Sequence, residues 1–500
     1  MQILSHKPRR GELFEIELEA IEVDGTSWTT MAAAVGPQAQ EVTLRFEVRG
    51  AAPGDRLRVR VLDCHRNVVT AVVDEVLAES PLREPATCRH FGSRKEAGRG
   101  CGGCSMQWAG YEGQLALKRE IVVRALAGAG VQPEDVPAVL GSPMSWNYRN
   151  KMEFSFGYSE AGDFALGLHP AGRKYDILDL TECHLESGEV AGVLEVARRW
   201  ARELGLAPYR PRQDEGWLRT LTVREGKRTG QRLVELTTTG AATAVCGGVE
   251  RDVGEIAALF GVAVEAELGE RVTSVVWTQH HAVRGQRTRF VHHTLTGRGT
   301  LDEELCVVAE QPLRFEVHPR AFFQPNTLGA ELLYRTVLEL SGLLAGRART
   351  VCDLYCGTGT IGLCLAGQAE AVVGVELQPD AVENARRNAA DNGILNATFL
   401  AGDVGEVLGG ELSGTLVGVD LVVVDPPRSG LMPKARQHIR AIGAPRLVYV
   451  SCNPTALGRD LVDLKRAGYR LERLQPVDMF PQTAHVETVA LLTLDLPGGP

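Results

Sequence analysis

Apolar and polar residues follow three different patterns along the chain of 500 residues. Over residues 11–77, short runs alternate between the two kinds and turn residues separate them, which is typical of half-buried strands. Residues 145–310 mix such strands with a few helices, among them an amphipathic helix over 188–204. From about residue 311, buried strands and helices take turns, which predicts a parallel sheet. We therefore expect a multidomain protein with a small β-barrel (1–80), a central α+β domain (81–310) and a C-terminal α/β Rossmann-like domain (311–500).

One predicted strand ends in the sequence Ser451-Cys452-Asn453-Pro454. The residues before it are apolar and β-rich, and leucines follow Pro454 at helical spacing, so we expect a strand and then a helix. Cys452 would then lie at the carboxyl end of a parallel strand, where open α/β sheets bind their ligands. The positive end of a helix lowers the pKa of a thiol, and the thiolate is the nucleophile. A reactive cysteine is therefore predicted; the alternative is a small buried core cysteine.

Composition restricts the class of protein. Hydrophobic residues make up 44% of the chain and charged residues 23%, as in ordinary globular proteins. No window is apolar over the length of a membrane helix, and the N-terminus lacks an apolar signal core, so we expect a cytoplasmic monomer with no membrane partner. In a reducing compartment, 11 cysteines favour metal binding or catalysis over disulfides. The net charge of −9 argues against indiscriminate binding of polyanions, but a local basic face is still compatible with RNA.

A glycine-rich turn follows the first strand of the C-terminal region, in Asp353-Leu-Tyr-Cys-Gly357-Thr-Gly359. Such glycines let a nucleotide-like ligand approach the backbone, and Glu376 at the end of the next strand is placed to accept ribose hydroxyls. No Gly-Lys-Ser/Thr follows, which excludes an ATP P-loop. The carboxylate of Asp353 disfavours a pyrophosphate and favours the cationic S-adenosylmethionine. Asp403, which ends the third strand, is placed to hold the adenine amino group.

A group of cysteines precedes the central strands: Cys88, then Cys101-Gly-Gly-Cys104, with Cys183 as a fourth candidate. The two glycines let both flanking thiolates turn onto one metal. Four thiolates suit either zinc or an iron–sulfur cluster, and the spacing alone does not choose between them. A redox-active Cys-x-x-Cys is a third interpretation, which the nearby Cys88 disfavours.

Several of these motifs together resemble the RNA uracil-C5 methyltransferases, and the resemblance covers essentially the whole chain in order. It implies a class I S-adenosylmethionine-dependent enzyme that makes 5-methyluridine in RNA, with 23S ribosomal RNA favoured over tRNA. The matching segments are Phe322-Phe-Gln324-Pro-Asn326, Asp353 to Gly359, Glu376, Asp403, Asp425-Pro-Pro-Arg428, Ser451 to Pro454, and Met479-Phe-Pro-Gln-Thr-Ala-His485-Val-Glu487-Thr-Val.

The resemblance also implies site residues. By position, Cys452 is the nucleophile that attacks C6 of uracil, and Glu487 is the base that removes the C5 proton. The target base must leave its stack to be reached. The implied cofactor contacts are Gln324, Tyr355, Thr360, Glu376 and Asp403, with Asp425 in or beside the site.

Two N-terminal features match the same family. The resemblance selects a [4Fe–4S] cluster on Cys88, Cys101, Cys104 and Cys183, although the family has five residues between its first two ligands and this chain has twelve. We expect the extra charged and glycine-rich residues to form a solvated excursion. Residues 48–59 resemble the TRAM domain, an OB-like barrel that binds RNA, so the barrel has either an RNA-contacting or a purely structural role.

Two alternatives remain from the residues alone. One is a catalytically silent RNA-binding iron–sulfur protein on the same fold, against which the intact Cys452 and Glu487 argue. The other is a methyltransferase for a different base that uses the Asp425-Pro-Pro lip and needs no Cys452. A radical enzyme would require Cys-x-x-x-Cys-x-x-Cys, which is absent from the sequence.

Overall fold

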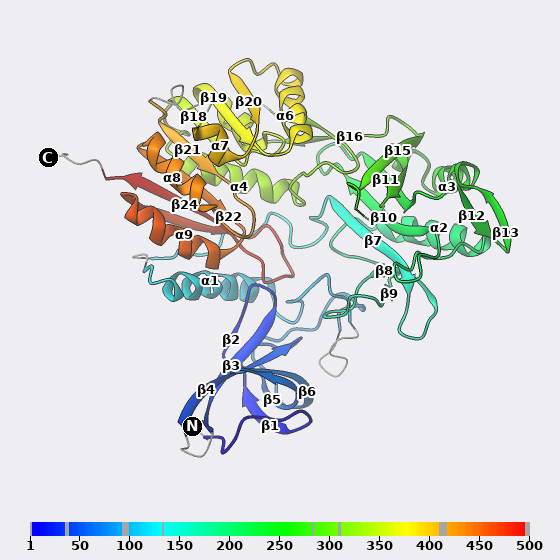
Figure 1. Ribbon diagram of the computed structural model, residues 1–500, viewed down its shortest axis with the longest axis horizontal. Helices are drawn as coiled ribbons and strands as arrows, with labels where there is room; N and C mark the ends of the chain where they lie inside the picture. Colours follow the sequence, from blue (N-terminus) through cyan, green and yellow to red (C-terminus); the bar gives the residue numbers. More distant parts are fainter. Residues whose placement is uncertain are drawn as a thin grey trace.

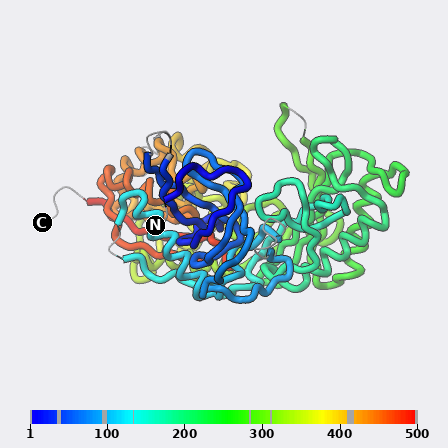
Figure 2. Tube along the Cα trace, turned by 90° about the horizontal axis from the view of Figure 1, so that it is seen from below, coloured from blue at the N-terminus to red at the C-terminus, as the bar shows by residue number. Residues whose placement is uncertain are grey.

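The computed structural model describes residues 3–35, 40–92, 100–132, 135–282, 285–308, 312–409 and 418–495. They form three bodies: an N-terminal sheet at the bottom of Figure 1, a central α+β body on the right, and an α/β body on the left. Seen from below in Figure 2, the N-terminal strands lie beneath the α/β body, and the central body extends to one side. No helix among the described residues has both the length and the apolar character needed to span a bilayer.

The N-terminal body is a six-stranded sheet in the order β1-β5-β6-β4-β3-β2. Strands β1 and β2 occupy opposite edges although they are neighbours in the sequence, so the sheet curls round on itself. Four or five strands were predicted here, and β3 was missed because its run of small residues lacks alternation. The strands are β1 (Leu13–Glu17), β2 (Ala20–Ile21), β3 (Thr26–Val35), β4 (Gln40–Arg49), β5 (Arg56–His65) and β6 (Val68–Ala78).

The central body is a seven-stranded sheet in the order β15-β14-β11-β10-β7-β8-β9. Its two main helices pack on it through residues such as Leu194 and Phe260. The predicted helix over 188–204 is confirmed, and β10 and β11 form an antiparallel hairpin that turns at 227–230. The elements are β7 (Lys151–Tyr158), β8 (Phe164–Leu168), β9 (Leu178–Asp179), α2 (Glu189–Glu203), β10 (Leu218–Glu225), β11 (Arg232–Thr239), β12 (Thr243–Cys246), β13 (Val249–Asp252), α3 (Val253–Leu268), η2 (Gly269–Arg271), β14 (Ser274–His281) and β15 (Arg289–Thr296).

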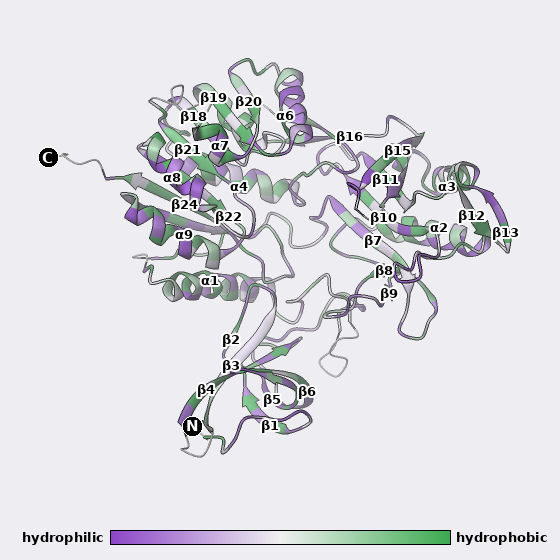
Figure 3. Cartoon of the chain, viewed as in Figure 1, coloured by the Kyte–Doolittle hydropathy of each residue, from purple (hydrophilic) through white to green (hydrophobic). Residues whose placement is uncertain are grey.

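The C-terminal sheet has the order β20-β19-β18-β21-β22-β24-β23, and β24 runs antiparallel to both of its neighbours. The predicted alternation of strands and helices is thereby confirmed. Its strands are mostly hydrophobic and the outer helix faces carry hydrophilic residues (Figure 3). The elements are α4 (Thr327–Leu340), β18 (Ala348–Leu354), α5 (Thr360–Ala366), β19 (Ala369–Glu376), α6 (Pro379–Asp391), β20 (Ala397–Ala401), α7 (Val404–Gly409), β21 (Leu421–Val424), α8 (Pro433–Ile442), β22 (Arg446–Ser451), α9 (Pro454–Arg466), β23 (Tyr469–Val477) and β24 (Glu487–Leu494).

Two segments cross the predicted domain limits. Helix α1 (Tyr111–Gly128), from the predicted central domain, packs on the C-terminal sheet beside α9 and shares a core with it. The hairpin of β16 (Leu301–Leu305) and β17 (Leu313–Val317) spans position 310 and packs on α4. Helices α4, α5 and α6 cover one face of this sheet, and α1, α7, α8 and α9 cover the other. The domain limits stay a prediction, but the C-terminal core includes both of these earlier segments.

Candidate active site at the carboxyl edge of the C-terminal sheet

The ends of two antiparallel strands bring the predicted nucleophile and base together. Ser451, the last residue of β22, pairs with Thr488 of β24, so the next residue on each side, Cys452 and Glu487, lie across from each other. Helix α9 begins directly afterwards, and the side chain of Asn453 caps it by accepting a hydrogen bond from the amide of Thr455 at 3.1 Å. The predicted strand, turn and helix around Cys452 are therefore confirmed.

The surroundings of Cys452 change its ionisation in the direction opposite to our expectation. Burial, followed by the charges of Glu487 and Asp425, raises the pKa of the Cys452 thiol to about 11, although Arg428 acts against the rise. The prediction of a lowered thiol pKa was wrong, because desolvation and two carboxylates outweigh the helix N-terminus. Burial and the charge of Asp425 also raise the pKa of Glu487 to about 8. At pH 7 both reacting groups are therefore mainly protonated.

Arg428 is a functional residue to which the sequence analysis assigned no role. Its guanidinium lies beside His485, 2.9 Å from Nδ1, and its carbonyl accepts a hydrogen bond from the Asn453 side chain at 2.9 Å. Burial and the nearby cation lower the pKa of His485 to about 4, so the neutral ring accepts a hydrogen bond from Arg428. Arg428 is thus held where its charge favours a thiolate at Cys452. The sequence signal for Arg428 is its place as the fourth residue of the motif Asp425-Pro-Pro-Arg428.

The glycine-rich turn between β18 and α5 lies beside the carboxylates of Asp353 and Glu376. Gly359 has φ +79°, and an added Cβ would lie 2.8 Å from the Phe399 ring, so a side chain does not fit there. Glu376 accepts hydrogen bonds from the amides of Gly357 at 3.1 Å and Gln378 at 2.9 Å. Asp353 is 0% exposed, and burial raises its pKa to about 7. Its Oδ2 accepts from the Gly362 amide, but its Oδ1 finds no partner among the described residues.

The other predicted cofactor residues, except Gln324, are spread over the same edge. Asp403 caps α7 by accepting from the amides of Gly405 and Glu406, and its charge contributes to the raised pKa of Tyr355. Thr360 opens α5, with its hydroxyl 3.3 Å from that of Tyr334. The backbone carbonyl of Gln324 accepts from Asn150 at 2.8 Å, and the Gln324 side chain is half-buried.

Asp425, which directly follows β21, completes this edge. Burial raises its pKa to about 7, and its charge acts on both Cys452 and Glu487. The fold therefore gathers the predicted residues other than Gln324 at one edge of the sheet, and the roles of all of them as cofactor contacts stay predictions.

The four predicted metal ligands converge in a second place, at the side of the central sheet. Cys88, Cys101, Cys104 and Cys183 line one pocket, and the pKa of each thiol is raised first by burial. Charges of the other cysteines add to this rise at Cys101, Cys104 and Cys183, so the thiols are mutual neighbours. Of the predicted excursion between the first two ligands, residues 93–99 lie outside the described residues. The donor chemistry fits a four-thiolate metal centre.

A competing set of metal ligands uses only one of the four cysteines. Ligand atoms of Cys88, Glu182 and His184 all lie within 4.8 Å of one another. This mixed set suits a borderline ion such as zinc, whereas the four thiols suit zinc or an iron–sulfur cluster.

Comparisons with known proteins decide the family. The family model described as tRNA (uracil-5-)-methyltransferase matches residues 284–494. An uncharacterised RNA methyltransferase of Caldanaerobacter subterraneus is 36% identical over 447 residues, which are 89% of this chain and 93% of that protein. Another, from Protochlamydia amoebophila, is 37% identical over 456 residues, covering 90% of this chain and all of that protein. The chain belongs to the RNA (uracil-5)-methyltransferase family.

A solved structure supports the assignment of this RNA methyltransferase to the family. The tRNA (uracil-54, C5)-methyltransferase of Pyrococcus abyssi, in complex with S-adenosyl-L-homocysteine, superposes with a TM-score of 0.69 and 26% identity. The match covers 96% of this chain and 100% of that one. The resemblance inferred from the motifs is therefore confirmed for the family and for the class of enzyme.

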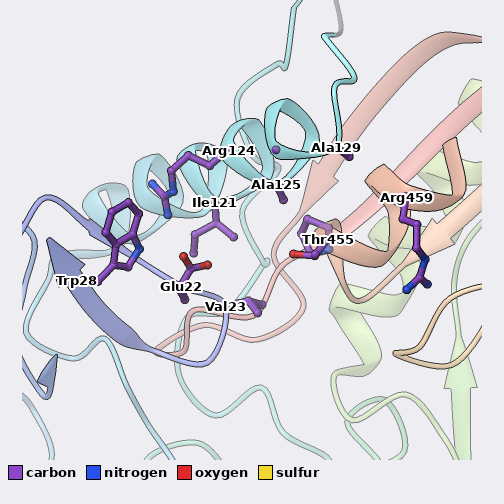
Figure 4. A pocket seen from close by; sticks show the side chains of 11 residues that line it. Glu22, Val23, Trp28, Ile121, Arg124, Ala125, Ala129, Thr455 and Arg459 are labelled. Atoms are coloured by element: carbon purple, nitrogen blue, oxygen red, sulfur yellow. The ribbon is translucent and has the colours of Figure 1, made fainter. Parts of the chain in front are cut away.

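A groove of the methyltransferase opens between the N-terminal sheet, α1 and the start of α9. It has a volume of about 490 Å³. Figure 4 shows Trp28 and Arg124 side by side at one end, and Thr455 with Arg459 at the other. The guanidinium of Arg45 lies 4.5 Å from the centre of the Trp28 ring, and that of Arg124 lies 5.9 Å from it. An aromatic ring among arginines suits a nucleic-acid strand.

Proposed function

We propose that this methyltransferase transfers a methyl group to C5 of a uridine in RNA through a covalent bond between Cys452 and C6. The observation that carries the proposal is the strand register that sets Cys452 across from Glu487. C5 of uracil is a weak nucleophile, so the reaction needs a thiolate at C6 and then a base at C5 of the same ring. Cys452, after the end of β22, supplies the thiolate, and Glu487, at the start of β24, supplies the base.

The charged neighbours suggest how protons move. Asp425 receives the proton of the Cys452 thiol, and Arg428 stabilises the thiolate as sulfur bonds to C6. Bound S-adenosylmethionine supplies the methyl group that C5 takes, and S-adenosylhomocysteine is released from this step. The C5 proton then passes to the Glu487 carboxylate. The S–C6 bond breaks, its electron pair returns to sulfur, and the C5–C6 double bond forms again.

S-adenosylmethionine is the methyl donor that the residues fit. The turn admits a ligand close to the backbone at Gly357, where an added Cβ would meet nothing, and the unpartnered Asp353 Oδ1 suits a cationic group. Glu376 and Asp403 end neighbouring strands, where hydroxyls and an amino group would be recognised. We assign the cofactor contacts to Gln324, Tyr355, Thr360, Glu376 and Asp403, with Asp425 beside the methyl group.

The RNA would reach Cys452 across the N-terminal sheet and the groove that contains Trp28. The TRAM resemblance of residues 48–59 supports a role of that sheet in RNA binding, and Arg124 and Arg459 provide positive charge in the groove. The motif resemblance favours 23S ribosomal RNA, whereas the Pyrococcus abyssi protein is a tRNA methyltransferase. We propose that the enzyme works as a cytoplasmic monomer.

The four converging thiols are proposed to hold a [4Fe–4S] cluster. Burial keeps these thiols protonated, so a bound metal would provide the positive charge that ionises them. Methyl transfer moves no single electron, so the centre would join residues 88–104 to Cys183 as a structural element. Chemical analysis of the purified protein should find iron and acid-labile sulfide rather than zinc.

One labelling experiment tests the proposal. Purified enzyme and methyl-labelled S-adenosylmethionine are incubated separately with unmodified tRNA and 23S ribosomal RNA transcripts, and the nucleosides are identified by mass spectrometry. Label in 5-methyluridine supports the reaction and identifies the RNA. Label in another nucleoside would indicate a methyltransferase for a different base. If cofactor binds but neither RNA is labelled, the silent RNA-binding alternative gains support.

A further inference from the structure

The segment that carries the proposed base is held from outside its own sheet. Between β23 and β24, the carboxylate of Asp478 is completely buried and accepts a hydrogen bond from the equally buried Lys118 ammonium of α1 at 2.5 Å. The hydroxyl of Tyr111, at the start of the same helix, donates to the other oxygen of Asp478 at 2.9 Å. Lys118 also donates to the carbonyl of Phe480 at 3.0 Å. Helix α1 therefore fixes the beginning of the segment that leads to Glu487.

The side chain of Gln114 holds the middle of this segment through two hydrogen bonds with Gln482. Gln114 of α1 donates from Nε2 to Oε1 of Gln482 at 3.0 Å, and its Oε1 accepts from the backbone amide of Gln482 at 2.9 Å. Gln114 is 1% exposed and Gln482 is 4% exposed. Gln482 has φ +69°, a left-handed conformation that residues other than glycine adopt at a cost. The two hydrogen bonds stabilise a backbone turn that does not form readily by itself.

The cysteine loop reaches the same turn. Ser105 directly follows Cys104, and the amides of Ser105 and Met106 both donate to the carbonyl of Gln482, at 2.9 and 3.0 Å. The hydroxyl of Ser105 accepts from the amide of Ala484 at 3.2 Å. The residue after a proposed metal ligand therefore contacts the chain three residues before Glu487. The cysteine pocket and the base segment are one connected unit.

We infer that Gln114 and Ser105 are positioning residues, which act through the turn at Gln482 to place the Glu487 carboxylate against C5 of the bound uracil. The inference rests on the proposed covalent reaction. Cys452 belongs to a different segment, between β22 and α9, so attack at C6 does not depend directly on these contacts. Proton transfer needs hydrogen-bond distance between base and substrate. Loss of the contacts should therefore slow release of the product more than formation of the adduct.

The test is the variant Gln114→Leu, which keeps the buried volume and removes both hydrogen bonds to Gln482, together with a third to the Ala109 carbonyl. Its matched control is Tyr469→Phe, which deletes a buried hydrogen bond to the Ala444 carbonyl in the same body, away from the base segment. Enzyme in excess is mixed with labelled S-adenosylmethionine and pooled tRNA and 23S ribosomal RNA transcripts. A denaturing gel separates labelled protein–RNA adduct from labelled free RNA, so the two steps are timed separately.

We expect Gln114→Leu to form the adduct at nearly the rate of the unaltered enzyme and to release it about 10- to 100-fold more slowly. Tyr469→Phe should behave like the unaltered enzyme in both steps. Gln114→Glu keeps the acceptor for the Gln482 amide but loses the donor, and it should show an intermediate release rate. If Gln114→Leu leaves release unchanged, or slows both steps equally, Gln114 does not position the base.

A second variant and a modified RNA substrate distinguish a failure of positioning from other causes. If Gln114→Leu does not fold, Ser105→Ala, which loses one hydrogen bond, undergoes the same test with the same expected direction. Transcripts made with 5-fluorouridine carry fluorine at C5, which does not leave as a proton, so the unaltered enzyme must accumulate the adduct. Absence of that adduct would overturn the covalent reaction itself, a result distinct from a failure of positioning.

Discussion

The two candidate sites of this methyltransferase both contain partly buried thiols, and the neighbours of these thiols differ. In the cysteine pocket, Cys101, Cys104 and Cys183 have other thiols among their charged neighbours. At the sheet edge, Cys452 has two carboxylates and the guanidinium of Arg428 beside it. Burial raises the pKa of the thiol in both places, to about 11 for both Cys101 and Cys452.

The comparison teaches that burial does not distinguish a metal ligand from a nucleophile. Burial raises the pKa values of the four pocket thiols, so they need a metal to ionise them, although Arg89 acts against the rise at Cys88. Cys452 instead lies next to Asp425, which is able to take its proton, and Arg428, which favours the resulting anion. The chemistry of each site is decided by the groups around the sulfur, and the following changes test this difference in order of expected size.

The largest effect is expected from Cys452→Ala. Without sulfur at this position no bond to C6 forms, and methyl transfer should fall by at least about 10⁴-fold, as for loss of other covalent nucleophiles. Incorporation of label into 5-methyluridine measures the effect, and RNA binding should be unchanged. Cys64→Ala, in the N-terminal sheet, should keep full activity. Substantial activity in Cys452→Ala would favour the alternative that uses only the Asp425-Pro-Pro lip.

The next effect is expected from Glu487→Gln, which keeps the size of the side chain but removes the base. One methyl group should still be transferred per enzyme, and release of the adduct should slow by about 10²- to 10⁴-fold. A denaturing gel with labelled cofactor would show a lasting protein–RNA band. Equal loss of methyl transfer and release would show that Glu487 acts before the adduct forms.

A smaller effect on catalysis, but a clear one on stability, is expected from Cys183→Ser. Losing one of four ligands should abolish iron binding and lower the melting temperature by about 5 °C or more. Iron analysis and a thermal melt measure the two quantities. Cys246→Ser, which changes a buried thiol outside the pocket, is the matched control. Unchanged metal content in Cys183→Ser would separate this cysteine from the metal centre.

The smallest effect is a dependence of product release on pH. The pKa of Glu487 is raised from its ordinary value of 4.5 to about 8, so the carboxyl is protonated and inactive as a base below pH 8. The release rate should therefore rise about tenfold per pH unit up to pH 8 and then level off. Single-turnover measurements between pH 6 and 9 would show it. A rate independent of pH over this range would contradict a base with the raised pKa.

The same shift predicts a change in stability. Between pH 4.5 and 8 the folded protein binds more protons at Glu487 than the unfolded chain, so this residue makes the free energy of unfolding fall as pH rises. Glu487→Gln removes that contribution. The variant should melt higher than the unaltered protein at pH 8, and the difference should shrink at pH 5.

Local features of the site were predictable from the sequence. The strand, turn and helix around Cys452 and the glycine-rich turn after Asp353 follow from residues close together in the chain. Strand β3 was missed because its small residues give no alternating signal, although it pairs with β4 along its length. The thiol pKa was predicted in the wrong direction, because the helix end is visible in the sequence and the two carboxylates beside it are not.

The sequence by itself determined the order of strands and helices, the residue types at their ends and the class of chemistry, since these depend on local periodicity and short motifs. Only the tertiary structure decided which groups meet. Gln114 and Lys118 are polar residues of α1 that are buried, and their partners Gln482 and Asp478 lie 368 and 360 residues away. Such pairings, and the pKa values that follow from them, arise when distant segments pack together, and no local pattern of residues encodes them.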